Sequence, residues 1–238
     1  MNAQELADLM PNAAYLESDE PEMESSLHYA QLALLVACLE MLWQDKTDFF
    51  IGANLTIYFS KDQLKSKDFR GPDFFLVKQT EKRPRRSWVV WEEDGKYLSV
   101  IIELLSASTA QVDRTLKKEL YQERFRTPEY FWFSPDTQEF AGYRLAGSRY
   151  EEILPNEYGQ RWSQELDLFL GVYDGQLRYF LPSGDRVLTP SEVASEAVAN
   201  AQEAQQTAAA AQQTAAAAEL RAAKLTEQLK TLGVEPEA

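Results

Sequence analysis

The run Val100-Ile101-Ile102-Glu103-Leu104-Leu105 is apolar except for one carboxylate. A continuous apolar run of this length is typical of a buried strand. An unpaired charge inside such a strand would be costly, so the Glu103 side chain is expected to have a specific partner. Glu103 is therefore the first candidate site residue.

A helix over residues 110–125 is predicted to follow this strand. Residues 106–109 are Ser-Ala-Ser-Thr, which supply N-capping side chains. Within the predicted helix, Asp113, Lys117 and Tyr121 are each four residues apart. Because positions four apart lie on the same side of a helix, these three side chains share one face.

A second apolar strand, residues 74–77, follows the pair Pro72-Asp73. Apolar spacing and aromatic or β-branched content predict the other elements. These are a helix from Ser25 or Ser26 through Leu42, one or two strands within 49–59, and strands at 129–134, 140–145, 150–154, 161–168 and 177–180. Helices and strands in this order predict an α/β or α+β fold with a central mixed sheet flanked by helices.

The acidic residues are concentrated at the two ends of the chain. Residues 1–24 contain seven acids and no Lys or Arg, and residues 191–238 contain seven acids and three bases, within a net charge of −14. The remaining 24 acids and 21 bases lie in residues 25–190, so this central part is nearly neutral. The net charge of the whole chain therefore neither supports nor excludes a DNA substrate. We expect an acidic arm (1–24), a folded domain (25–190) and a tail (191–238).

The tail is predicted to be one long helix. Residues 205–211, Gln-Gln-Thr-Ala-Ala-Ala-Ala, repeat at once as residues 212–218. A seven-residue repeat in strong helix formers favours a coiled-coil-like helix with a weak alanine seam. Leu220, Leu225, Leu229 and Leu232 thicken its apolar stripe near the end. Two alternatives stay open: a solvated tail, or a helix that assists a homodimer or binds a partner.

Cysteine and hydropathy indicate the compartment. Cys38 is the single cysteine, which rules out an internal disulfide and a cysteine-rich metal site. The single histidine, His28, leaves little room for a His-based metal cluster or a Ser-His-Asp triad. The N-terminal residues do not have the pattern of a secretory signal, and no apolar run reaches membrane-spanning length. We expect a cytoplasmic protein with no membrane partner.

Asp73, Glu103 and Lys117 could together carry out phosphodiester hydrolysis. This reaction needs carboxylate oxygens to hold a hard cation such as Mg²⁺ and a cationic group to orient water. The two acids lie on separate predicted strands, Lys117 can lean back toward the strand end, and backbone carbonyls near Leu104 could complete the metal shell. A structural alternative has Asp73 in a turn and Glu103 paired with an Arg or Lys.

These residues resemble the motifs of the Uma-type restriction endonuclease family, within the PD-(D/E)XK nuclease superfamily. That family has Pro-Asp before a hydrophobic strand, then a strand with Glu that ends in Leu-Ser, then a helix with Ser/Thr, Asp, Lys and Tyr. The similar residues here are Pro72-Asp73, 101–106, Ser108-Thr109, Asp113, Lys117, Tyr121 and the aromatic run 128–135. Residues 184–190 and the long helix closing on 232–236 are similar too.

The resemblance implies a restriction-endonuclease-like core and a Mg²⁺- or Mn²⁺-dependent DNA endonuclease. Asp73 and Glu103 would hold the metal, and Lys117 would position the attacking water or stabilise the developing charge. The superfamily usually places its lysine two residues after the strand Glu, where this chain has Leu105. The family's helix lysine, which corresponds to Lys117, would take over that role.

Four further residues are candidate supporting groups. Asp113 is expected to pair with Lys117 at i, i+4 spacing. Lys118 is the second choice of lysine, because it points about 100° away on an ideal helix. Tyr121 could contact the site or belong to the core. Glu24 could be an additional metal ligand, as a helix acid is in many superfamily nucleases. Alternatively, it could cap a helix or lie on the surface.

A function from a different class stays open. The same core could be a catalytically inactive nuclease fold that binds nucleic acid or another protein. Residues 61–86 contain nine bases and four acids around Asp73. This stretch could track phosphates or could be an ordinary pair of solvated loops.

Overall fold

The computed structural model describes residues 16–20, 23, 25–60, 71–106 and 110–232. The chain divides into two compact units, Met1–Thr189 and Pro190–Ala238. The expected mixed α/β fold, with a central mixed sheet and a long C-terminal helix, is confirmed. Glu24, Ser108 and Thr109 lie outside the described residues.

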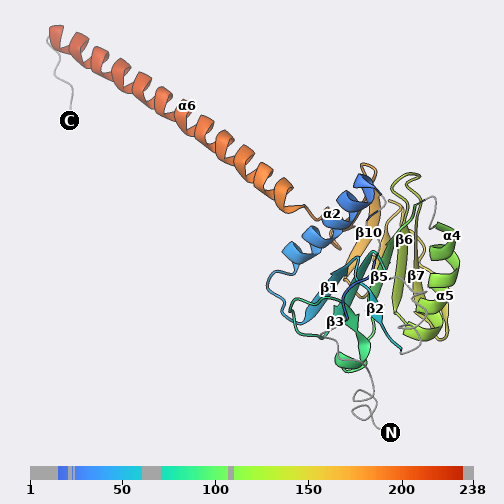
Figure 1. Ribbon diagram of the computed structural model, residues 1–238. Coiled ribbons are helices and arrows are strands. Elements are labelled where there is room, and N and C mark those ends of the chain that lie inside the picture. Colours follow the sequence, from blue (N-terminus) through green and yellow to red (C-terminus); the bar gives the residue numbers. More distant parts are fainter. Residues whose placement is uncertain (1–15, 21–22, 24, 61–70, 107–109, 233–238) are drawn as a thin grey trace. The chain divides into compact units, whose positions relative to one another are not determined.

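A six-stranded sheet forms the centre of the first unit (Figure 1). β5 and β6 are parallel neighbours, and the other neighbouring pairs are antiparallel. A parallel pair requires a crossover connection, which the helical segment of residues 110–125 provides. In spatial order the strands are β1 (Phe49–Ala53), β3 (Phe74–Lys78), β5 (Val100–Leu104), β6 (Glu129–Phe133), β7 (Phe140–Ala146) and β8 (Arg149–Glu152).

The two faces of β5 belong to two hydrophobic clusters. Val100, Ile102 and Leu104 pack in one cluster with the buried face of helix α2 (Ser26–Leu42). Ile101 packs on the opposite face, in a cluster with Tyr121 from the 110–125 segment. Side chains alternate along a strand, so Glu103 lies on the same face as Ile101, toward the 110–125 segment. Figure 1 shows these helices on opposite faces of the sheet.

Helix α2 begins where the sequence predicts. Ser25 is its N-cap, and the Ser25 side chain accepts a hydrogen bond from the backbone N–H of His28. Leu35, Cys38 and Leu39 of this helix are fully buried, so Cys38 is an interior thiol. The helix thereby anchors one face of the sheet.

A three-stranded sheet of β9 (Arg161–Ser163), β10 (Leu168–Tyr173) and β11 (Gln176–Phe180) follows the main sheet. The prediction of one strand over 161–168 is wrong, because a turn separates β9 from β10. Ser163 Oγ accepts a hydrogen bond from the backbone N–H of Leu166, and Asp167 has a left-handed φ of 56°. A short parallel pair, β2 (Ile57–Tyr58) with β4 (Trp88–Val89), and a 3₁₀ turn, η2 (Val90–Glu92), complete the unit.

The second unit contains helix α6 (Pro190–Thr231), an unbroken helix of 42 residues. The prediction of one long helix in the tail is confirmed, and none of the α6 residues is buried. Across the described part of the chain, no helix combines the length and apolar character that crossing a bilayer requires.

Candidate active site

Sheet register brings Asp73 beside Glu103. β3 and β5 are antiparallel, and Phe74 pairs with Ile102, so the residue before β3 lies next to the end of β5. The backbone N–H of Asp73 lies 3.3 Å from Glu103 Oε2, and the backbone N–H of Leu104 donates to Asp73 Oδ2 at 2.7 Å. Two carboxylates that are 30 positions apart in the sequence are therefore neighbours at one edge of the sheet.

The Lys117 side chain lies between two acids. Its Nζ is 3.0 Å from Glu103 Oε1 and 2.9 Å from Asp113 Oδ1. The side chains of Glu103 and Asp113 are almost completely buried, whereas that of Lys117 keeps 17% of its surface exposed. The Lys117 side chain thus compensates the buried charges of Glu103 and Asp113 and is still partly exposed to solvent.

Two buried tyrosines hold Glu103 and Asp113 in place through hydrogen bonds. The Tyr121 hydroxyl donates to Glu103 Oε1 at 2.7 Å, so this oxygen accepts hydrogen bonds from both Tyr121 and Lys117. The Tyr130 hydroxyl donates to the backbone carbonyl of Asp113 at 2.8 Å. Tyr130 was not predicted from the sequence as a site residue. Its pairing with Ile101 in the β5–β6 register is the feature that places it under the helix.

The 110–125 segment alternates α and π turns. Residues Ala110–Val112 (α4) and Lys118–Leu120 (α5) are α-helical, whereas Asp113–Lys117 (η3) and Tyr121–Phe125 (η4) are π-helical. In a pure α-helix, positions four apart rotate by about 40° at each step, which would separate the first and last of three such side chains by about 80°. The wider π turns rotate the chain less per residue, so Asp113, Lys117 and Tyr121 stay on one face.

Burial and charge set the protonation of the site. Burial raises the pKa of Glu103 to about 7, and the charge of Asp73 adds to this rise against the opposing effects of Lys117 and Tyr121. Burial also raises the pKa of Asp73. For Lys117, burial lowers the pKa, but the acids around it outweigh burial and raise it above its ordinary value. Lys117 is therefore a permanent cation at neutral pH, and Glu103 titrates near neutrality.

The other candidate residues lie elsewhere. The Nζ of Lys118 lies over the Tyr143 ring, 3.2 Å from its centroid, on the side toward β7. Lys118 is thus directed away from the two acids, although it is adjacent to Lys117. Glu24 is outside the described residues.

Comparison with known protein families identifies the family of this chain. A sequence model of the Uma2 family, described as putative restriction endonuclease, matches residues 18–177 of the 238. The chain belongs to the Uma2 family. The protein is therefore a nuclease in general class. The family resemblance of its motifs is confirmed. The match ends before residues 184–236, so the similarity of that ending stays a prediction.

Solved structures that resemble this Uma2-family chain include one that is described as a nuclease. A putative nuclease belonging to DUF820 from Anabaena variabilis ATCC 29413 has 16% sequence identity and a TM-score of 0.45. The alignment covers 70% of this chain and 90% of that chain. No curated protein matches the chain.

In its described part, the basic stretch before β4 has ion-pair partners within this Uma2-family chain. Residues 61–70 lie outside the described part, and the five bases of 71–86 each form an ion pair. The pairs are Lys78 with Glu165, Lys82 with Glu40, Arg83 and Arg85 with Glu93, and Arg86 with Glu17. In the described residues these pairs favour an ordinary pair of solvated loops over a phosphate-binding patch.

Glu129 is a buried acid of a different kind. Its carboxylate accepts hydrogen bonds from Arg144, from the Ser163 hydroxyl and from the backbone N–H groups of Gln164 and Glu165. Glu129 pairs with Val100 at the start of β5, whereas Glu103 lies near the end of that strand. Glu129 therefore joins the main sheet to the β9–β10 turn and is a structural carboxylate.

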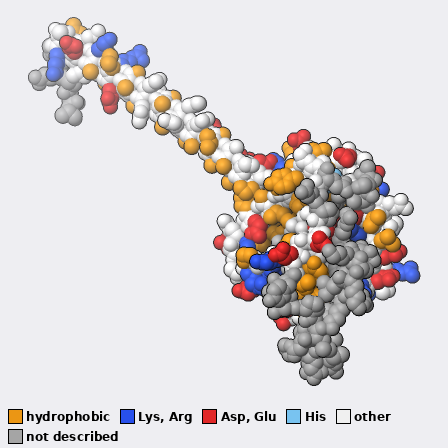
Figure 2. Space-filling view, viewed as in Figure 1, with side chains coloured by type: hydrophobic (Ala, Val, Ile, Leu, Met, Phe, Trp, Pro, Cys, Tyr) orange, Lys and Arg blue, Asp and Glu red, His pale blue; other side chains and the backbone are white. Residues whose placement is uncertain are grey.

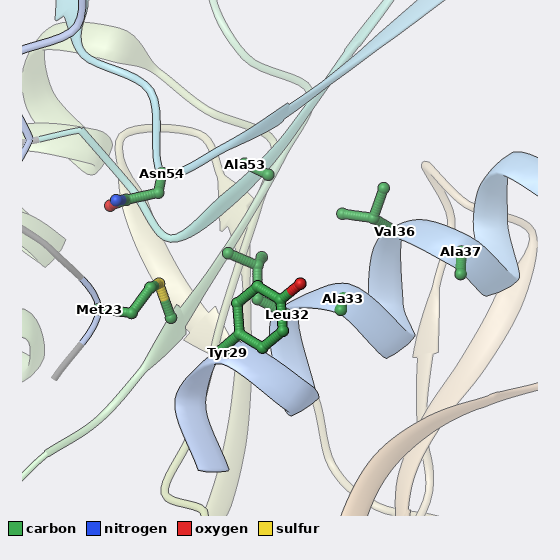
Figure 3. A pocket seen from close by; sticks show the side chains of 8 residues that line it. All are labelled: Met23, Tyr29, Leu32, Ala33, Val36, Ala37, Ala53 and Asn54. Atoms are coloured by element: carbon green, nitrogen blue, oxygen red, sulfur yellow. The ribbon is translucent and has the colours of Figure 1, made fainter. Parts of the chain in front are cut away.

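A pocket of about 450 Å³ lies beside α2 (Figure 3). None of its described lining residues has a charged side chain, so this described lining offers no charged group to bind phosphate or a metal ion. The lining residues are Met23, Tyr29, Leu32, Ala33, Val36, Ala37, Ala53 and Asn54. This pocket is separate from the Asp73–Glu103–Lys117 cluster.

Proposed function

We propose that this protein is a metal-dependent endonuclease that hydrolyses phosphodiester bonds of DNA. The observation that carries the proposal is the cluster at the end of β5. There, Asp73 and Glu103 are adjacent carboxylates, and the Lys117 ammonium contacts Glu103 at 3.0 Å. Family membership supports the class of reaction, and the geometry supports the assignment of residues.

The donor set fits Mg²⁺ or Mn²⁺. Carboxylate oxygens are preferred ligands of such hard cations, and Mg²⁺ is commonly held by one or two carboxylates together with water and substrate phosphate. Within the described residues, no cluster of three or more His, Cys, Asp or Glu side chains is arranged around a metal position. Asp73 and Glu103 would be the protein ligands, because they are adjacent carboxylates at the end of β5. When bound, the cation supplies Lewis-acid chemistry at the scissile phosphate.

Lys117 contributes positive charge and hydrogen-bond donors and does not act as a proton acceptor. Its raised pKa keeps the ammonium protonated at neutral pH. An ammonium has three N–H donors; the hydrogen bond to Glu103 uses one of them, and Asp113 forms an ion pair with the group. A remaining N–H can hold the attacking water in place or donate to a phosphoryl oxygen as negative charge develops.

Asp113 and Tyr121 act through other residues. Asp113 holds the Lys117 ammonium through a second ion pair, at 2.9 Å. Tyr121 stabilises the ionised form of Glu103, which burial disfavours. Both are positioning residues in this proposal.

The experiment is a cleavage assay on supercoiled plasmid, single-stranded DNA and single-stranded RNA, with Mg²⁺, Mn²⁺ or EDTA. We expect cutting of DNA that requires the cation and that Glu103→Gln abolishes, with a single cooperative thermal unfolding transition as the folding control. Equal cutting in EDTA would overturn the metal dependence. Cutting of RNA alone would overturn the substrate. Nucleic-acid binding without cutting would favour the inactive binding module.

A further inference from the structure

One face of α6 has an apolar residue at every position of an alternating three- and four-residue spacing. This spacing averages the 3.5-residue period of left-handed coiled coils. We call this face the alanine–leucine seam. Its residues are Ala194, Ala197, Ala201, Ala204, Ala208, Ala211, Ala215, Ala218, Ala222, Leu225, Leu229 and Leu232, the last lying one position beyond the helix end.

The seam has no cover within the described part of the chain. None of the α6 residues is buried, and Leu225 and Leu229 expose 54% and 38% of their surface. Figure 2 shows apolar side chains along the length of α6 and charged side chains gathered toward its C-terminal end. A straight apolar seam of this period is buried by another helix that has the same period.

We propose that the seam pairs with the seam of a second copy of this chain, in antiparallel orientation. Side-chain size supports the orientation, because the distance between two packed helices depends on the residues at their contact. A parallel pair would place alanine on alanine over most of its length and leucine on leucine at one end. An antiparallel pair places Leu225 and Leu229 opposite Ala201 and Ala197, so at both ends of the pair a large side chain faces a small one.

Charge supports the same orientation. Residues 190–210 contain three acids and no base, whereas residues 211–231 contain two acids and three bases. A parallel pair would place the two acidic halves side by side, where like charges repel. An antiparallel pair places each acidic half along the basic half of the other copy. The chain is therefore complementary to its own reversed copy in both size and charge, which identifies a second copy as the occupant.

The antiparallel pair would link two nuclease domains but keep their active sites apart. In an antiparallel pair the two Pro190 ends lie at opposite ends of a rod about 60 Å long. Each site would then work alone, so breaking the pair should leave cleavage per chain unchanged. A monomeric chain that still cleaves would therefore count against the dimer alone, and a dimer that does not cleave would count against the proposed nuclease function alone.

The first test measures the mass of the full chain by light scattering on a sizing column. We expect twice the 27.2 kDa of one chain. Combining Ala211→Glu with Leu225→Glu should return the monomer mass. The matched control combines Ala210→Glu with Leu220→Glu, two changes of the same kind on the outer side of α6, and should keep the dimer. A monomeric wild type, or equal masses for the two variants, would overturn the proposal.

The second test fixes the orientation by oxidative cross-linking. Chains with Ala197→Cys are mixed with chains with Leu229→Cys, and the buried Cys38 remains in both. An antiparallel pair should cross-link the two kinds of chain to each other, and each kind alone should stay uncross-linked. Cross-linking of Ala197→Cys chains with themselves would show a parallel pair and overturn the orientation.

Discussion

The Nζ atom of Lys117 lies 3.0 Å from Oε1 of Glu103, across the gap between the end of β5 and the helix that follows it. This contact compensates a fully buried carboxylate with a cation that keeps part of its surface at the solvent. It also places a protonated amine beside the pair of acids formed by Asp73 and Glu103. The following predictions depend on this contact and on the groups around it.

Replacing Lys117 by Met should destabilise the fold in a pH-dependent way. Without the ammonium, the pKa of Glu103 would rise further above 7, so the folded state would keep a proton that the unfolded state releases above about 4.5. The wild type already keeps this proton up to about pH 7, so the additional loss of stability in the variant develops as pH rises above 7. We expect a loss of about 3 kcal/mol near pH 8 and a smaller loss near pH 5.

Urea unfolding at several pH values measures this effect. Lys118→Met is the matched control, because Lys118 is the neighbouring lysine and contacts Tyr143 instead of the acids. Its change in stability should be small and similar at each pH. An equal pH dependence for the two variants would contradict the importance of the Lys117–Glu103 contact.

Binding of Mn²⁺ in the absence of DNA should weaken as pH falls below 7. The pKa of Glu103 is raised to about 7, and a carboxylate must lose its proton to coordinate a cation. We expect the affinity to fall about tenfold for each pH unit below that value and to level off above it. Titration calorimetry gives the affinities. A pH-independent affinity, or one that Glu103→Gln leaves intact, would count against Glu103 as a ligand.

Removing the Tyr121 hydroxyl should move the acidic limb of the pH–activity profile to higher pH. This hydroxyl donates to Glu103 Oε1 and favours the ionised carboxylate, so Tyr121→Phe should raise the pKa of Glu103 further. The cost in folding stability should be about 1 kcal/mol. Tyr150→Phe is the control, because the Tyr150 hydroxyl donates to the Thr127 carbonyl outside the site. Identical profiles for both variants would refute a positioning role for Tyr121.

Glu129 and Glu103 should respond in opposite ways to the same substitution. Glu129→Gln weakens a buried network that includes Arg144 and the β9–β10 turn, so we expect a loss of about 3 kcal/mol with Mn²⁺ affinity retained. Glu103→Gln should remove Mn²⁺ affinity with a smaller change in stability. Chemical unfolding and calorimetry on both variants make the comparison. Loss of metal affinity in Glu129→Gln, measured where the variant is folded, would contradict this division.

Local sequence patterns predicted the elements that hold the site. The apolar run that ends near Leu105 became β5, and residues 110–125 became the helical crossover. Spacing of four residues correctly placed Asp113, Lys117 and Tyr121 on one face. The π turns that preserve this alignment were not predicted, because they follow from how the segment packs on the sheet and not from a residue pattern.

Tertiary contacts explain what the sequence left open. The turn that ends β9 depends on Ser163 and on N–H groups that point to the distant Glu129 carboxylate. The bases before β4 looked exposed in sequence, but their partners, such as Glu17 and Glu165, lie far away along the chain. Such pairings are set by the fold, so composition alone does not reveal that the five bases of 71–86 form ion pairs.

Single-turnover cleavage of plasmid DNA with Mg²⁺, compared between Lys117→Ala and Lys118→Ala, is the sharpest test of Lys117 as a catalytic residue. The two variants remove neighbouring lysines of one helix, and only the first removes a group that contacts Glu103. We predict that Lys117→Ala slows cleavage by about a hundredfold or more while DNA binding is retained, and that Lys118→Ala cleaves at nearly the wild-type rate. Wild-type cleavage by Lys117→Ala would contradict the account.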